Sequence, residues 1–282
     1  MNAYLSGLLV LYALNLISTL SAFLSLSGGS LNLAIAGYMA LGAYITAWLV
    51  NSYPVPPFLV MTGGMAACCV LAFVFENLVR SLKGLYYSLA SFALSQIVPA
   101  VFMNIESLGG AAGYPVAAFI PPWYTWACAG AALACILYLS FTYAALYLNA
   151  ISHDTLVPAL MGIPARPIIL SSALISAAFA GLGGGLYALS FGFVEAQHFT
   201  IMLSIYAVLT ALVGGTQTPW GAPAGAAVLT FAPELFRVSD QWRYVIFAFI
   251  LLACLYLRPA GLLTSDLFRR KRPERTESER LS

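Results

Sequence analysis

The sequence predicts an all-α polytopic membrane protein with eight or nine transmembrane helices, some of them short or broken. Of its 282 residues, 61% are hydrophobic and only 8% are charged, whereas roughly a quarter of the residues in soluble domains are charged. Its mean hydropathy is +0.89. The apolar runs are long and do not alternate with polar residues, which favours helices over the strands of a membrane barrel. The bilayer is therefore the expected solvent for most of the chain.

Each crossing of the ~30 Å hydrocarbon core takes about 20 helical residues. The expected spans are residues 5–26, 31–51, 57–78, 84–104, 122–148, 167–190, 200–214, 221–236 and 243–258. The first run follows no basic segment and is long for a signal-peptide core, so we expect it to be retained as a span. Glycines in 31–51 and the short length of 200–214 leave both eight and nine crossings open.

Basic residues predict the orientation, because cytoplasmic loops carry an excess of Lys and Arg. Nine crossings place Arg80, Lys83, Arg166, Arg258 and the basic tail 265–282 on one side, which is then the cytoplasm. We expect one permeation domain over residues 1–264, which includes a polar cytoplasmic loop at 149–166. The tail is expected to be disordered and to lie near anionic headgroups.

The sequence argues against several classes of function. It has no phosphate-binding G-x-x-x-x-G-K-[ST] motif, no metal-ligand spacing and no nucleophile–base pair, so we expect no enzyme and no cofactor bound by this chain. Its histidines, His153 and His198, fall in loops on opposite faces. No nucleic-acid partner is expected. The acidic residues lie mostly in loops or at span ends, which disfavours the alternative of an ATP-independent secondary carrier or channel.

Polar residues inside two spans are candidates for a solute pathway. Glycines break the stretch 26–44, and Ser30 and Asn32 place polar groups there. Irregular backbone is tolerated in a membrane only where it is buried in protein or lines a wet cavity. The alternative is close helix packing through small residues.

In the span 84–104, Ser88, Ser91 and Ser95 share one helix face. These serines either line a pathway or form hydrogen bonds between helices, which is the commoner use of serine in spans. The pathway candidates are therefore Ser30, Asn32, Ser88 and Gln96.

Two further segments are rich in glycine. Four glycines between 181 and 185 predict a tight crossing or a kink in the span 167–190. Glycines and prolines at 214–223 predict a tight cytoplasmic turn between two short spans.

Near the middle of the chain, residues 149–167 form a polar interruption in which Ser152 is a candidate N-cap of a short helix. Leu160 and Met161 contribute to an apolar surface suited to a partner's groove. The alternative is an amphipathic connection that lies on the lipid headgroups.

Several short motifs occur in a characteristic order along nearly the whole chain. They are Leu31-Asn32-Leu33, Gly42-Ala43-Tyr44, Lys83-Gly84-Leu85-Tyr86, Gly109-Gly110 with Gly113, Ala180-Gly181-Leu182, Gly185-Leu186-Tyr187-Ala188, Gly214-Gly215, Trp220-Gly221 and Arg258-Pro259-Ala260-Gly261-Leu262. In this order the motifs resemble the membrane permease subunits of branched-chain amino acid ABC importers, of the LivM-like or LivH-like type.

The resemblance implies a multi-pass subunit of the bacterial inner membrane with a cytoplasmic C-terminus. Its expected partners are a second, LivH-like permease, two LivG/LivF-like ATPases that bind ATP and Mg, an extracytoplasmic solute-binding protein and the bilayer. The implied solute is a branched-chain or other hydrophobic amino acid. A pathway so poor in charge suits urea, short amides or small aromatic acids as well.

In such a machine the loop 149–166 holds a coupling helix that sits in a groove of the ATPase. The residues of this sequence implied in that contact are Asp154, Leu156, Ala159, Leu160 and Gly162. The loop departs from the family pattern, because the usual Arg and acidic residues are missing and Pro158 replaces a helix former. We therefore expect a shorter coupling helix that begins near Pro158 and depends more on apolar packing.

Overall fold

The computed structural model describes residues 2–82, 84–153, 158, 161, 162, 164–235, 252 and 256. Its main helices are α1 (Asn2–Ser27), α2 (Ile35–Ser52), α3 (Pro57–Leu78), α4 (Leu85–Met103), α5 (Pro122–Ser140), α6 (Tyr143–His153), α8 (Ala165–Phe191), α9 (Ile201–Gly214) and α10 (Gly221–Leu235). Short 3-10 turns η1 (Glu106–Leu108), η2 (Gly110–Ala112) and η3 (Ala196–His198) and strands β1 (Tyr114–Pro115) and β2 (Phe193–Val194) complete it. The predicted tail 265–282, and the span 243–258 apart from residues 252 and 256, lie outside the described residues.

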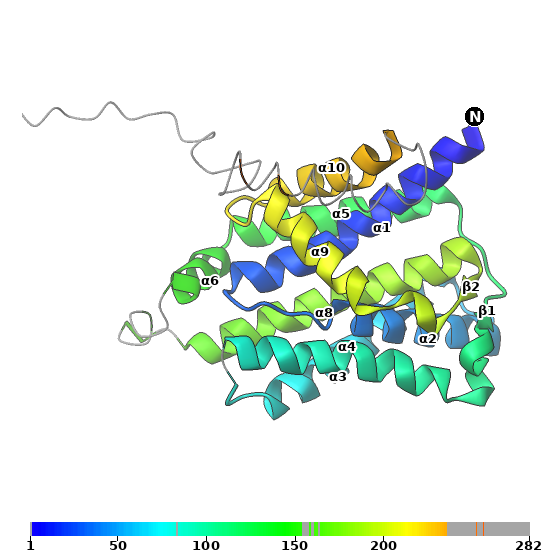
Figure 1. Ribbon diagram of the computed structural model, residues 1–282, viewed down its shortest axis with the longest axis horizontal. Helices are drawn as coiled ribbons and strands as arrows, with labels where there is room; N and C mark the ends of the chain where they lie inside the picture. Colours follow the sequence, from blue (N-terminus) through cyan, green and yellow to red (C-terminus); the bar gives the residue numbers. More distant parts are fainter. Residues whose placement is uncertain are drawn as a thin grey trace, which may run out of the picture.

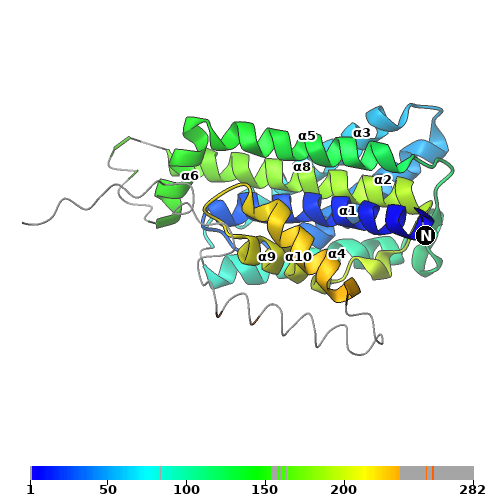
Figure 2. The same ribbon diagram turned by 90° about the horizontal axis from the view of Figure 1, so that it is seen from above.

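The long helix α8 forms the centre of the bundle (Figure 1). It packs most extensively against α2, α3 and α1. Figure 2 shows α5 and α8 on one side of α1, with α9 and α10 on the other. One end of the bundle carries α6 and is called the α6 end; the other carries β1 and β2 and is called the strand end.

The apolar runs predicted most helices well. Five helices within the described part are long and apolar enough to cross a membrane, namely the helices at Tyr4–Ser27, Pro57–Leu78, Leu85–Met103, Pro122–Ser140 and Ala165–Phe191. The polytopic all-α fold is thus confirmed. The predicted span 31–51 differs, because residues 28–34 are not helical and α2 begins only at Ile35.

The predicted span 122–148 is wrong as a single helix, because the chain bends at residues 141–142 between α5 and α6. Hydroxyl groups there compete with backbone N–H groups for the helix carbonyls. Ser140 Oγ donates to the Leu137 carbonyl at 2.6 Å, and Thr142 Oγ1 donates to the Tyr138 carbonyl at 3.0 Å. The backbone N–H of Thr142 bonds to Leu139, three residues back. Such local bonds tighten and end a helix.

Glycines allow the central helices to cross in close contact, as the sequence predicted for the 181–185 cluster. A Cβ atom at Gly184 would overlap the Met39 carbonyl of α2, and one at Gly42 would overlap the Gly181 carbonyl of α8. Helix α8 remains unbroken through this region. The glycines therefore serve a tight crossing, with backbones in contact across α2 and α8.

The predicted turn between the last two described helices is confirmed, since α9 ends at Gly214 and α10 begins at Gly221. It lies at the α6 end (Figure 1). At the opposite end, β1 and β2 pair antiparallel, with Tyr114 opposite Val194. Asn51 at the end of α2 holds this hairpin, because its amide donates to the Pro115 carbonyl and accepts from the Ala117 N–H.

Candidate functional site

The most unusual local structure is the non-helical segment 28–34, which enters the bundle between α1 and α2. Helix α1 ends in a Schellman motif: the N–H of Ser30 bonds to the Ser25 carbonyl, and the N–H of Gly29 bonds to Leu26. The left-handed backbone of this motif suits Gly29, whose φ is +74°. After Gly29 the chain stays non-helical, with Leu31 exposed and Asn32 and Ala34 buried, and becomes helical again at Ile35 (Figure 1).

Polar side chains satisfy the backbone of this segment, as a hydrocarbon environment requires. Ser91 Oγ of α4 accepts from the Leu33 N–H at 3.0 Å, and Asn32 Oδ1 accepts from the Ala34 N–H at 2.9 Å. Ser204 Oγ of α9 accepts from the Ala36 N–H at 2.8 Å. The beginnings of α2 and α9 therefore meet inside the bundle, with α4 beside them.

Two of the four predicted pathway residues, Ser30 and Asn32, lie in the non-helical segment itself, and a third, Ser88, lies one helical turn before Ser91 on the buried face of α4. Asn32 is 2% exposed and Ser88 is 6% exposed. Ser30 is half-buried and donates to the Ser25 carbonyl at 3.1 Å. Gln96 lies elsewhere, on the exposed face of α4. The predicted serine face is real, because Ser91 and Ser95 are also fully buried.

A carboxylate at the end of a predicted span lies next to the same junction. Glu76, in the last turn of α3, is half-buried and accepts a hydrogen bond from Tyr87 Oη of α4 at 2.7 Å. The hydroxyl of Tyr38 in α2 is buried and has no hydrogen-bond partner within the described part of the chain. The pairing of Glu76 with Tyr87 was not predictable from the sequence, because the residues around both are regularly apolar.

A second polar contact that the sequence did not reveal joins α1 to α8. Ser176 Oγ donates to the Ser21 carbonyl at 2.9 Å, and Ser25 Oγ donates to Ser176 Oγ at 2.9 Å. Ser21 Oγ in turn donates to the Ser176 carbonyl at 2.8 Å. All three side chains are buried. This cluster fixes α1 against the central helix just before the non-helical segment begins.

The predicted ATPase contact lies at the α6 end and is described only in part. Asp154, Leu156, Ala159 and Leu160 lie outside the described residues. Gly162 is exposed with a φ of +79°, and the neighbouring Met161 side chain is 76% exposed. Arg166, at the start of α8, donates to Asn77 Oδ1 of α3 at 3.0 Å and so ties the loop's far end to the bundle.

The expected N-cap at Ser152 is wrong. Ser152 lies within α6, and its hydroxyl donates to the Asn149 carbonyl three residues earlier at 2.8 Å. The helix formed by the apolar run continues through this residue to His153, so its side chain bonds backward along α6 instead of capping a new helix.

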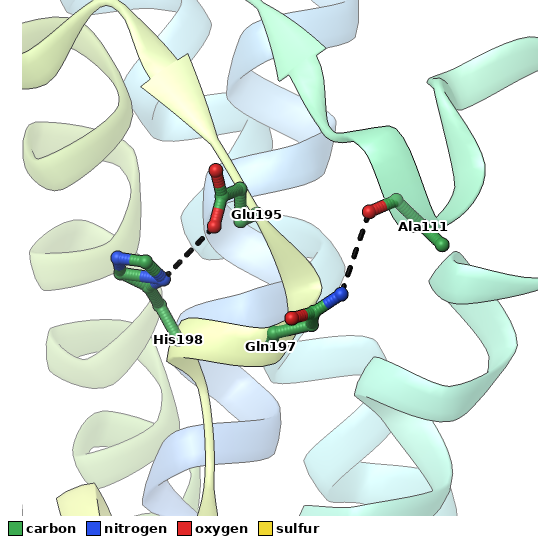
Figure 3. A network of polar contacts seen from close by, with 4 residues as sticks. All are labelled: Ala111, Glu195, Gln197 and His198. Atoms are coloured by element: carbon green, nitrogen blue, oxygen red, sulfur yellow. Dashed lines mark hydrogen bonds and ion pairs between the residues drawn. The ribbon is translucent and has the colours of Figure 1, made fainter.

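At the strand end, a small polar network faces outward (Figure 3). Nδ1 of His198 lies 3.3 Å from Oε2 of Glu195, and Gln197 Nε2 donates to the Ala111 carbonyl at 3.5 Å. His198 is exposed and Glu195 is partly exposed. His153 is the last residue of α6 and so does not lie in a loop as predicted, but it and His198, in η3, do lie at opposite ends of the bundle. The ranges with assigned structure contain no cluster of His, Cys, Asp and Glu fit for a metal.

The helical fold and the polar groups around a broken helix define a multi-pass membrane protein organised around a partly buried, non-helical segment. A family model described as the permease component of branched-chain amino acid transport systems matches residues 4–255. The chain therefore belongs to this permease family.

Two curated relatives match a shorter stretch. Both are described as the high-affinity branched-chain amino acid transport system permease protein LivM. The protein from Escherichia coli is 30% identical and that from Salmonella typhimurium 29% identical, each over 115 residues. The match covers 41% of this chain but only 27% of each relative's length. No solved structure matches the chain.

Proposed function

We propose that this chain is a permease subunit of an ATP-driven ABC importer and forms part of its pathway for branched-chain or other hydrophobic amino acids. The observation that carries the proposal is the non-helical segment 28–34 inside a helical membrane domain. Discontinuous helices of this kind supply solute sites in transporters, because their backbone and side-chain polar groups are held within the bundle. Membership of the permease family is consistent with that use.

The chemistry of the junction favours a solute that needs no strong ionic contact in the membrane. Ser30, Asn32 and Ser88 supply hydroxyl and amide groups on and beside the segment, and all three already bond to backbone groups. A zwitterionic amino acid fits such a weakly interacting path when a separate binding protein makes the selection. The LivM relatives carry branched-chain amino acid transport in their names, which supports the same solute class.

Gln96 lies away from the segment 28–34, and the proposal gives it a role at the surface of the subunit. It is exposed on a face of α4 that also exposes Leu89 and Phe92, which are 55% and 42% exposed. A polar amide within a membrane span is costly against lipid and is expected to face protein or a wet cavity. We therefore assign this face of α4 to the side where the second, LivH-like permease closes the pathway.

The α6 end is proposed to face the cytoplasm and the ATPases. Arg80 and Arg166 lie at this end, in the turn after α3 and at the start of α8, and both are basic as a cytoplasmic face requires. In this orientation the loop 149–166 meets two LivG/LivF-like ATPases, the C-terminus is cytoplasmic, and the strand end receives the solute-binding protein. ATP and Mg act on the partner ATPases of the bacterial inner membrane.

Association with an ATPase tests the proposal. Met161→Asp places a charge on an exposed apolar side chain of the loop, so it leaves the bundle intact but opposes an apolar contact. We expect the tagged variant to lose the ATPase that co-purifies with the unmodified chain. Thr200→Asp is the matched control, because it adds the same charge at the strand end, at the N-cap of α9 where Asp is favourable.

Two outcomes count against the proposal. If Met161→Asp co-purifies with as much ATPase as the unmodified chain does, the loop does not form the contact. Solute uptake by the purified chain alone, without ATP, would instead indicate a self-contained carrier or channel.

A further inference from the structure

The last turn of α6 lies directly on the beginning of the non-helical segment. A Cβ atom placed on Gly29 would come within 2.9 Å of Ser152 Cα and 3.1 Å of Ser152 Cβ. Real Cβ atoms do not approach backbone this closely, so the contact exists only because residue 29 has no side chain. Backbone meets backbone here, with no flexible side chain between them to absorb a displacement.

The Schellman motif alone does not account for this contact. It explains the left-handed φ of Gly29, and Gly192 at the end of α8 fulfils the same need with a φ of +67°. A Cβ atom added to Gly192, however, would have nothing within 4 Å, whereas one added to Gly29, which is otherwise exposed, would meet Ser152 of α6. The two glycines therefore share a backbone conformation and differ in what they touch.

Both sides of the contact are anchored in elements with a proposed role. On one side, Leu148 and Ile151 bury the inner face of α6, which continues directly into the loop 149–166. On the other side, Ser30 follows Gly29 directly, and Asn32 comes two residues later at the interior junction. Gly28 adds a looser contact, 3.4 Å from its Cβ position to Leu148 Cδ2.

We propose that the contact between Ser152 and Gly29 transmits movement of the loop 149–166 to the segment 28–34, which makes Gly29 a positioning residue of the transport cycle. When the ATPases displace the end of α6, Gly29 has to follow, and Ser30 and Asn32 shift with it. The inference rests on the proposed function, since it requires an ATPase seated on this loop.

The test is the amount of radiolabelled leucine imported per ATP hydrolysed by the assembled transporter in proteoliposomes. Gly29→Ala separates the two surfaces, and coupling between sites is worth about 5–150-fold in proteins. We expect a loss of about fivefold or more in leucine imported per ATP, with ATPase activity retained. Gly192→Ala carries the same backbone penalty without a contact, so its ratio should match that of the unmodified protein.

A cross-link keeps the inference testable where Gly29→Ala does not assemble. Cysteines replace Gly28 and Leu148 after removal of the five native cysteines, and a short thiol cross-linker joins them. Because the two surfaces are proposed to move together, the joined transporter should keep its uptake. Loss of uptake on joining, reversed by cleavage of the cross-link, would show that they must separate and would overturn the inference.

The other outcomes are equally decisive. Equal import ratios for Gly29→Ala and Gly192→Ala would refute the inference and leave the proposed function intact. Absence of ATP-driven uptake by the unmodified transporter would refute the proposed function, and the inference with it.

Discussion

Hydroxyl groups act mainly as backbone partners in the interior of this permease. The serine face of α4 was predictable from its spacing, but the sequence left open whether its members line a path or bond between elements. Ser91 bonds across to Leu33 of the broken segment, while the bond of Ser95 within the described part of the chain is to Phe92 of its own helix. Two serines in one face thus have different functions, because only one of them meets a non-helical backbone.

This difference gives a prediction at the residue scale. Ser91→Ala leaves the Leu33 N–H without its partner, which costs about 1–3 kcal/mol for a buried donor. Ser95→Ala removes only a local bond of an equally buried serine. Thermal unfolding of the purified protein in detergent should show a clearly lower Tm for Ser91→Ala than for Ser95→Ala. Equal Tm values would contradict the assigned role of Ser91.

Helices were predictable from composition where a run was apolar and unbroken, and less so where polar groups turn the chain. Gly28, Gly29 and Asn32 marked the break before α2 in the sequence. The bend at residues 141–142 gave no such signal, because Phe141 and Thr142 continue an apolar run and only the local hydroxyl bonds reveal it. Ser176 was missed for a related reason, since a lone serine in a span does not indicate its partner.

The crossing of α2 and α8 yields a prediction at the element scale. A methyl group at Gly184 meets the Met39 backbone, whereas at Gly183 it reaches only side-chain atoms at ordinary contact distances, 3.4 Å from Ile17 Cγ2 and 3.6 Å from Met39 Cε. Gly184→Ala should therefore destabilise the protein by about 1–3 kcal/mol through overpacking, while Gly183→Ala should be tolerated. The yield of monodisperse protein and its Tm measure this. A more damaging Gly183→Ala would contradict the described crossing.

At the scale of the whole molecule, the order of the motifs and the hydropathy predicted the family and the multi-pass fold. The predicted contact residues Asp154, Leu156, Ala159 and Leu160 remain a proposal, as do the pathway roles of Ser30, Asn32, Ser88 and Gln96. The position of Ser88 beside the broken segment was not predictable, because it depends on how α4 packs against the segment 28–34.

Orientation can be measured directly. In a protein without native cysteines, Ser81→Cys lies in the exposed turn at the α6 end and Asn104→Cys is exposed at the strand end. A membrane-impermeant maleimide added to intact cells should label Asn104→Cys, and Ser81→Cys only after permeabilisation. The reverse pattern would place the α6 end outside and would exclude its contact with cytoplasmic ATPases.

The central claim is that ATP hydrolysis by partner subunits moves solute through a pathway built partly by this chain. Its most direct test is leucine uptake into proteoliposomes that contain the purified complex, with and without ATP at the ATPase face, beside liposomes that contain this chain alone. We predict uptake only by the complex and only with ATP. Uptake by the chain alone, independent of ATP, would contradict the account.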